Sequence, residues 1–214
     1  MDFEKAGAYI EGLYAERKLT QKQYTAATAL KAFAPVVDDD VARMLQVLIT
    51  LARPQKILEI GTSVGFSTVS MAKAVKTYGG KITTIEFDAA VADQAVKNFE
   101  REQVADRIEV RIGDARKIIP ALAAEYDLIF QDVGDKELYG EMLADYIRLL
   151  KPGGLLLAED TLFPVMDFGS GSGHLAQMSK ALDAFNKKLA ACPHFESTLL
   201  PIGDGLTVAV IISG

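Results

Sequence analysis

The sequence lacks most of the features on which several common kinds of protein depend. It has one cysteine, Cys192, and only two histidines among 214 residues, and its apolar runs are short stretches such as GLLLA. A single cysteine cannot form an internal disulfide, and runs of this length are far too short to cross a bilayer. The two histidines, His174 and His194, have no partner at the spacing of a metal site or a catalytic triad. We therefore expect a soluble protein whose chemistry does not depend on histidine.

Basic residues are also scarce. Lys and Arg total 23 against 29 Asp and Glu, which gives a net charge of -6 with no basic cluster along the chain. Binding to nucleic acid or to an anionic membrane requires such clusters, so neither is an expected partner. The amino-terminal segment MDFEKAGAYIEGLYAERK carries charges where a signal peptide needs an apolar core. Together with the lone cysteine, this predicts a cytoplasmic protein.

The first part of the sequence is predicted to be helical. Ala6, Ile10 and Leu13 fall on one face of a helix, and a second apolar face follows the acid triplet at 38–40. Acidic residues in that position are typical of a helix start, and a metal-binding role is the alternative reading of the triplet. We expect residues 1–53 to form a helical cover outside the main sheet.

From residue 54 the pattern changes to short apolar runs that alternate with helix-length segments. The runs are KILEI, KITTIE, RIEVRI, YDLIFQD and GLLLAE, and the segments lie at about 65–77, 88–102, 114–124 and 135–150. This alternation predicts a parallel sheet with helices on both faces. A further helix over HLAQMSKALDAFNKKLA precedes two strands around the turn GDG, which predict an antiparallel hairpin at or near a sheet edge. The fold class is therefore α/β, with a mostly parallel seven-stranded sheet in 54–214 and a single domain over 1–214.

A glycine turn follows the first predicted strand, in LEIGTSVGFSTVSMA at 58–72. Ligands of such sheets bind beyond the carboxyl ends of the strands, and the first strand-to-helix turn is the usual place. Gly61 and Gly65 allow the backbone to bend and to approach a ligand, while Ser67 and the free helix amides offer hydrogen bonds. The spacing G-x-x-x-G differs from the pyrophosphate-binding pattern G-x-G-x-x-G. An NAD-dependent oxidoreductase is therefore the less favoured alternative.

Acidic residues end the next two predicted strands. Glu86, in ITTIEFD, can accept hydrogen bonds from both hydroxyls of an adenosyl ribose; its alternative role is that of a helix cap or a solvated acid. Asp114 and Ala115, in GDA, can border an adenine, unless Asp114 merely caps the following helix. The three strand ends together predict a pocket for a nucleoside that lacks phosphates.

Several segments, in order, resemble the class I S-adenosylmethionine-dependent methyltransferases, and in particular the cation-dependent O-methyltransferases related to catechol and caffeoyl-CoA O-methyltransferases. The glycine turn is similar to L-E-I-G-T-x-x-G-Y-S, with Phe66 in place of tyrosine. YDLIFQDVGDKELY resembles F-D-x-x-F-I-D-A-D-K-x-x-Y, LLKPGGLLLAEDTLF resembles L-L-x-x-G-G-x-x-x-x-D-N-x-L-W, and AFNKKL with LLPIGDGL resembles the closing segment. The resemblance covers the chain from about Pro35 to its end. It implies a Rossmann-like class I fold and transfer of a methyl group from S-adenosylmethionine to a hydroxyl group.

The resemblance also implies roles for particular residues. Gly61 and Gly65 would shape the pocket for the methionine part of the cofactor, Ser67 would bind its carboxylate, and Glu86 would hold its ribose. The full set of implied cofactor contacts is Val37, Glu59, Gly61, Thr62, Gly65, Ser67, Glu86, Phe87, Asp114, Ala115 and Asp132.

The implied cation site departs from the family pattern. Asp132, Glu159 and Asp160 stand at the ligand positions, where the family has an Asp-Asn pair in place of the last two. Hard cations such as Mg²⁺ accept carboxylate oxygens, and the longer arm of Glu159 suits Mn²⁺ or Ca²⁺ as well. A third carboxylate would weaken the effect of the cation on a bound hydroxyl. Alternatives are a metal-independent methyltransferase, or a protein that binds S-adenosylmethionine without O-methylation activity.

The catalytic residues implied by the resemblance are Asp132 and Lys136. Asp132 would lie near the transferred methyl group as well as bind the cation. Lys136 would act as a general base or as an electrostatic aid to the departing proton. It follows DVGD, which is one residue longer than the family's D-A-D-K, and the alternative is a solvated lysine at the start of an exposed helix.

The expected acceptor is a small hydroxylated aromatic molecule. Aromatic and neighbouring residues near the last motifs either line its pocket or fill the core: Tyr139, Phe163, Met166, Phe168 and His174. Relatives of this kind are commonly dimers, so the resemblance implies a homodimer.

Overall fold

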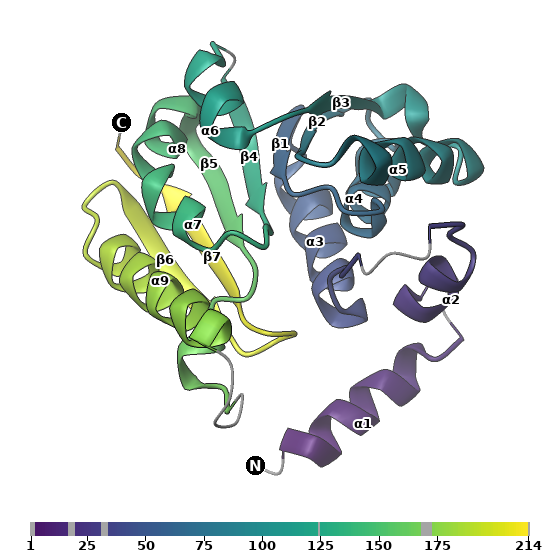
Figure 1. Ribbon diagram of the computed structural model, residues 1–214, viewed down its shortest axis with the longest axis horizontal. Coiled ribbons are helices and arrows are strands. Elements are labelled where there is room, and N and C mark those ends of the chain that lie inside the picture. Colours follow the sequence, from purple (N-terminus) through teal and green to yellow (C-terminus); the bar gives the residue numbers. More distant parts are fainter. Residues whose placement is uncertain (1–2, 17–19, 31–33, 124, 168–172, 214) are drawn as a thin grey trace.

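Seven strands form one sheet within the residues that the structure, a computed structural model, describes: 3–16, 20–30, 34–123, 125–167 and 173–213 (Figure 1). The strands are β1 (Lys56–Ile60), β2 (Lys81–Glu86), β3 (Ile108–Ile112), β4 (Tyr126–Gln131), β5 (Leu150–Ala158), β6 (Phe195–Leu200) and β7 (Leu206–Ile211). Their order is β3-β2-β1-β4-β5-β7-β6. The first five are parallel, and β7 is antiparallel to both β5 and β6. The predicted mostly parallel sheet with a carboxy-terminal hairpin is confirmed.

Helices connect the strands. In the described residues they are α1 (Phe3–Tyr14), α2 (Gln21–Ala26), α3 (Asp39–Ala52), α4 (Phe66–Val75), α5 (Ala89–Arg101), α6 (Ala115–Ile118), α7 (Glu137–Glu141), α8 (Leu143–Leu149) and α9 (Gly173–Ala190), with 3-10 turns η1 (Ala105–Arg107), η2 (Ile119–Ala121) and η3 (Phe163–Val165). The helix expected over 114–124 is cut short, because Pro120 cannot donate a backbone hydrogen bond and a 3-10 turn replaces the helix there. The helix expected over 135–150 is divided into α7 and α8 at Met142. Hydrogen bonds of the helical type continue across that division, from Met142 to Leu138 and from Tyr146 to Met142.

The two faces of the sheet bury alternate residues of the same strands. In β1, Ile57 packs toward α3, α4 and α5, whereas Leu58 and Ile60 pack toward α6, α7, α8 and α9. This period of two is the reason that the sheet carries helices on both faces, as Figure 1 shows. Whether a residue of β1 faces one side of the sheet or the other therefore follows from its odd or even position along the strand.

The amino-terminal helices differ in how closely they pack. Tyr24 of α2 is fully buried, and its hydroxyl donates to the carbonyl of Val64 in the glycine turn at 2.8 Å. In contrast, the apolar residues Tyr9 and Leu13 of α1 are 69% and 59% exposed.

The acid triplet does begin a helix, as expected, with Asp38 at the cap position of α3. In the part of the chain that the structure describes, none of the helices combines the length and apolar character needed to span a membrane. The division into a cover and a core stays a prediction.

Replacing Gly61 by alanine should destabilise the fold. Gly61 has a φ of +92°, and an added Cβ would lie 1.8 Å from the carbonyl oxygen of Asp132. The two nearest atoms belong to the backbone of Asp132 and cannot move away as a flexible side chain could, so we expect a loss of about 2–4 kcal/mol or more in the free energy of unfolding. Urea denaturation would measure it. The control is Gly140→Ala in α7, where an added Cβ meets nothing within 4 Å; unchanged stability of the Gly61 variant would contradict this account.

Candidate active site

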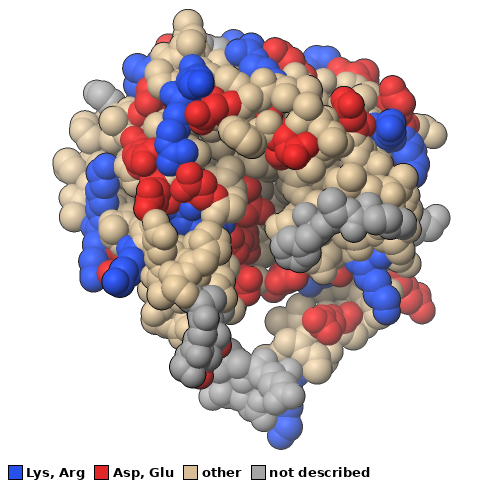
Figure 2. All heavy atoms as spheres, in the orientation of Figure 1, with Lys and Arg blue, Asp and Glu red and all other residues tan. Residues whose placement is uncertain are grey.

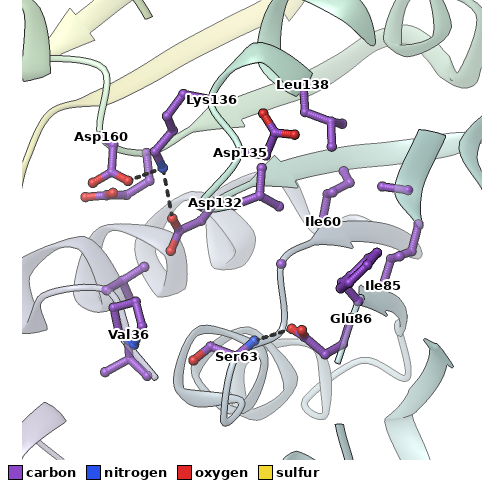
Figure 3. Close-up of a pocket in the computed structure, with 18 of the residues that line it drawn as sticks. Val36, Ile60, Ser63, Ile85, Glu86, Asp132, Asp135, Lys136, Leu138 and Asp160 are labelled. Atoms are coloured by element: carbon purple, nitrogen blue, oxygen red, sulfur yellow. Dashed lines mark hydrogen bonds and ion pairs between the residues drawn. The ribbon is translucent and has the colours of Figure 1, made fainter. Parts of the chain in front are cut away.

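A cavity of about 930 Å³ opens at the carboxyl ends of the parallel strands. The described residues that line it come from 34–38, 60–63, 85–91, 113–116, 132–138 and 159–163, with Gln21, Met178 and Asp204. Figure 2 shows the hollow as a groove between two lobes of the surface, with acidic side chains exposed along it. Figure 3 shows Glu86 and Ser63 on one side of the cavity, and Asp132, Lys136 and Asp160 on the other. The cavity therefore has two ends of different chemistry.

At the first end, the glycine turn holds the carboxylate of Glu86. The amide of Ser63 donates to Glu86 Oε2 at 2.9 Å (Figure 3). The amide of Asp88 donates to Oε1 at 3.0 Å. These two bonds fix the direction of the carboxylate, whose remaining lone pairs are free for a ligand. Ser63 also lines the cavity, and its buried hydroxyl has no hydrogen-bond partner among the described residues. An unpaired hydroxyl in a cavity wall is a natural contact for a polar ligand.

Other residues predicted at this end also line the cavity. They are Val37, Gly61, Phe87, Asp114 and Ala115. Asp114 does cap α6, as the alternative reading held, because its side chain accepts from the amide of Arg116 at 2.9 Å. The cap uses one carboxylate oxygen, so capping and a place in the cavity wall are compatible.

Four of the predicted cofactor contacts do not line the cavity: Glu59 of β1, Thr62 and Gly65 of the turn, and Ser67 of α4. The side chain of Glu59 is completely buried, and Ser67 is 5% exposed. The Ser67 hydroxyl donates to Glu59 Oε1 at 2.6 Å. The structure therefore directs this hydroxyl into the protein, and the sequence alone gave no sign of that direction.

The second end of the cavity is a group of three carboxylates. Oxygens of Asp132, Glu159 and Asp160 all lie within 4.8 Å of one another, a grouping that could hold a metal ion. Burial raises the pKa of Asp132 to about 6, against the opposing effect of Lys136 and with the support of Asp160. Burial, a hydrogen bond to Asp160 and the charge of Asp132 raise the pKa of Glu159 well above its ordinary value. Like charges held this close in a buried place require protons or a bound cation.

Lys136 lies inside this group. It is 3% exposed, so the alternative of a solvated lysine is wrong. Its ammonium forms an ion pair with Asp160, lies 3.9 Å from Asp132 Oδ1, and donates to the hydroxyl of Tyr139 at 3.2 Å. The rings of Tyr139 and Phe163 lie 5.0 Å and 5.8 Å from the ammonium nitrogen. The additional residue in DVGDK thus does not prevent Lys136 from reaching the acids.

Two further acids extend the charge toward the rim. Asp38 and Asp204 line the cavity, and neither forms an ion pair with a described residue. Burial and the neighbouring carboxylates of Asp204 and Asp40 raise the pKa of Asp38. Burial and Asp160 raise the pKa of Asp204. Asp38 belongs to the triplet for which a helix start was expected and a metal-binding role was the alternative, whereas sequence reasoning missed Asp204, which stands in a hairpin turn.

The residues predicted to line an acceptor pocket have different positions. Phe163 lines the cavity, whereas Tyr139 is buried behind it, and Met166 and His174 lie outside it on the surface. The prediction for Phe168 falls outside the described residues. Met178 of α9 lines the cavity instead, a contribution that the helical spacing could not distinguish from core packing.

The fold and the two-ended cavity at its strand ends define a class I methyltransferase. Residues 11–212 match the family described as O-methyltransferase. The chain is 32% identical over 186 residues to catechol O-methyltransferase from Niastella koreensis, covering 82% of this chain and 81% of that protein. It is 30% identical to caffeoyl-CoA O-methyltransferase 1 from Eucalyptus globulus, covering 81% and 74%. The chain belongs to the O-methyltransferase family, and the recognition made from the motifs is confirmed.

Solved structures agree with this assignment. An O-methyltransferase from Bacillus cereus in complex with S-adenosylhomocysteine is 26% identical, with a TM-score of 0.77 and coverage of 95% and 97% of the two chains. TomG from Streptomyces achromogenes, in complex with S-adenosylmethionine, has a TM-score of 0.80 at 22% identity over the full length of both chains. The latter identity is low enough that the likeness concerns the fold alone. The predicted Rossmann-like class I fold is confirmed.

The buried Glu59 predicts a pH dependence of stability. Burial raises its pKa from 4.5 to about 7, partly opposed by hydrogen bonds from Ser67, Thr68 and Thr84. Between pH 4.5 and about 7 the folded protein keeps a proton on Glu59 that the unfolded chain has lost. The stabilisation that results from this difference is fully present below pH 4.5 and is lost as the pH rises to about 7. Glu59→Gln cannot titrate. We expect its unfolding free energy, relative to the wild type, to gain roughly 3 kcal/mol between these limits. Urea denaturation across this range would test it, and parallel pH profiles for the two proteins would contradict it.

Proposed function

We propose that this protein transfers a methyl group from S-adenosylmethionine to a hydroxyl of a small aromatic acceptor, with the help of a divalent cation. The observation that carries the proposal is that one cavity has Glu86 at one end and Asp132, Glu159 and Asp160 at the other. A nucleoside at the first end would place its reactive group toward the second. The complex of the Bacillus cereus O-methyltransferase with S-adenosylhomocysteine supports the identity of the nucleoside.

The cofactor end fits an adenosyl group without phosphates. We propose that Glu86 holds the ribose hydroxyls, that Asp114 and Ala115 border the adenine, and that Val37 and the Ser63 hydroxyl contact the remainder. Gly61 brings backbone close to the ligand, and the described residues of the turn, 61–65, include no basic side chain that could neutralise a pyrophosphate. Arg116, which also lines this end, is ion-paired with Asp135 and Glu141. This chemistry favours S-adenosylmethionine over NAD.

The acidic end fits a divalent cation. Its three carboxylates are hard oxygen ligands, and the charge of Lys136 balances only one of them. Mg²⁺, Mn²⁺ and Ca²⁺ all accept such a set. When bound, the cofactor supplies a methyl group on a sulfonium, and the cation lowers the pKa of a neighbouring hydroxyl.

The residues of the chain then orient the acceptor and exclude water. Phe163 and Met178 offer apolar contacts to an aromatic ring at the acidic end. The ion pair with Asp160 holds the Lys136 ammonium in place, which favours an electrostatic role beside the developing oxyanion over abstraction of its proton. Asp132 joins the two ends, because it follows β4 directly and its backbone contacts the glycine turn.

The proposal extends to assembly and location. Tyr9 and Leu13 of α1 and Val47 and Leu51 of α3 expose large apolar surfaces, which support a homodimer. The single cysteine, Cys192, is free, as in proteins of the reducing cytoplasm.

Removal of divalent cations should stop turnover without releasing the cofactor. In excess EDTA we expect methyl transfer to catechol to fall by roughly 100-fold or more, because the acceptor hydroxyl keeps its proton. The affinity for S-adenosylhomocysteine, measured by calorimetry, should change less than about threefold, because its site is at the opposite end of the cavity.

A matched pair of variants completes this test. Asp160→Ala removes one oxygen ligand and should weaken Mn²⁺ binding, whereas Asp183→Ala, on the exposed face of α9, should not. Full turnover in EDTA would favour the metal-independent alternative. Cofactor binding with no transfer to any of a panel of catechols would favour a protein without O-methylation activity.

The acidic rim predicts a preference for acceptors that carry no negative charge. Asp38 and Asp204 add to the three carboxylates at the cation end, so an anionic acceptor would be repelled even with a cation bound. We expect kcat/KM for 4-methylcatechol to exceed that for 3,4-dihydroxybenzoate by about tenfold, with a smaller ratio at high salt. Asp204→Asn should reduce the ratio, and Asp183→Asn should leave it unchanged. Equal values for the two acceptors, or a preference for a coenzyme A thioester, would contradict the expectation.

A further inference from the structure

We propose that Asn186 is a positioning residue of the acidic end: from α9 it holds the acidic loop, residues 159–162, in the shape that directs the Asp160 carboxylate into the group of three acids. The inference rests on the proposed function, because that group is the proposed cation site. It assigns a role to a side chain that does not line the cavity.

The backbone of Asp160 has an uncommon conformation. Its φ is +64°, in the left-handed region, where residues other than glycine are strained, although aspartate tolerates it better than most. In this conformation its carboxylate forms the ion pair with Lys136 (Figure 3). One of its oxygens also lies within 4.8 Å of oxygens of Asp132 and Glu159. A strained conformation persists only where the surrounding structure restrains it. The restraints on the acidic loop therefore decide where this carboxylate lies.

The turn between β6 and β7 restrains the acidic loop from one side. The carbonyl of Gly205 accepts from both the amide and the hydroxyl of Thr161, each at 3.0 Å. The carbonyl of Asp204 accepts from the amide of Leu162 at 2.9 Å. These bonds hold the donors of the loop. None of them uses the carbonyl of Thr161.

Asn186 holds that carbonyl from the other side. Its Nδ2 donates to the carbonyl of Thr161 at 2.7 Å, from a position 25 residues further along the chain. The carbonyl accepts no other hydrogen bond from the described residues. Thr161 is completely buried, so water does not reach it to replace this donor. The peptide group that follows Thr161 is thus held at its oxygen by α9 and at its nitrogen by the turn between β6 and β7.

Lys188, two residues further along α9, provides a matched control. Its Nζ donates to the carbonyl of Gly140 in α7, also at 2.7 Å. Both side chains therefore attach α9 to a backbone carbonyl of another element by a bond of the same length. Only the bond of Asn186 ends in the acidic loop. A general need for anchoring of α9 would make the two side chains equivalent.

Asn186→Leu keeps the approximate size of the side chain and removes its donor. The acidic loop is then held from one side alone, so Asp160 can relax from its strained conformation and withdraw its carboxylate. We expect the affinity for Mn²⁺, measured by calorimetry, to fall about three- to tenfold. The affinity for S-adenosylhomocysteine should change less than about twofold, because its site is at the other end of the cavity. Lys188→Met should change neither affinity.

A double variant distinguishes positioning from a general loss of structure. In the background of Asp160→Ala, Asn186→Leu should weaken Mn²⁺ binding no further, because the ligand that it positions is absent. An equal additional loss in that background, or an unchanged Mn²⁺ affinity in the single variant, would overturn the inference. If Asn186→Leu does not fold, Thr161→Val replaces it. This variant loses the hydroxyl bond to Gly205 and should bind Mn²⁺ about two- to fivefold more weakly, and an unchanged affinity would again overturn the inference.

Crystal structures without metal give a readout that does not depend on the proposed function. We expect Asp160 in Asn186→Leu to have a negative φ and to lose its ion pair with Lys136, whereas the wild type and Lys188→Met keep both features. An unchanged Asp160 in Asn186→Leu would overturn the inference. A wild type that binds no Mn²⁺ would instead contradict the proposed cation site, and these structures alone would then decide the inference.

Discussion

The site depends on the close approach of two backbone segments where β1 and β4 end. Gly61 follows β1, and any side chain there would overlap the carbonyl oxygen of Asp132, which follows β4. The amide of Asp132 also donates to the carbonyl of Ile60 at 2.9 Å. Because glycine permits this contact, the turn proposed to hold the nucleoside and the first of the three clustered carboxylates share one cavity. A larger separation would leave two unconnected sites.

The opposite ends of that cavity are stabilised in different ways. Glu86 is held by two backbone amides and keeps free lone pairs. Asp132, Glu159 and Asp160 instead repel one another around a single ammonium, that of Lys136. Such a cluster of carboxylates lowers the free energy of unfolding when no cation is bound. Sites that bind charged ligands commonly reduce local stability in this way. Burial, followed by the neighbouring carboxylates, raises the pKa of Asp132 and of Glu159, and these raised pKa values reflect that loss of stability.

The sequence was sufficient for the order of the elements and for the acids at the strand ends, because periodicity and ordered motifs report both. Glu86 is an example, since it ends a strand of clear alternation and lies in the cavity wall. The direction of side chains in the glycine turn was not predictable, and Ser67 turns away from the cavity toward Glu59. For Lys136 the sequence left a catalytic role and a solvated helix start as alternatives; its packing against Tyr139 and its burial exclude the second. Contacts of this kind depend on residues far apart in the chain, and local patterns do not contain them.

One crystal structure would test the central claim most directly: that of the protein with S-adenosylhomocysteine and Mn²⁺ bound. The account predicts the ribose at the carboxylate of Glu86, the adenine beside Ala115, and an anomalous peak among Asp132, Glu159 and Asp160. A nucleoside bound elsewhere, or an acidic cluster without metal at saturating Mn²⁺, would contradict it.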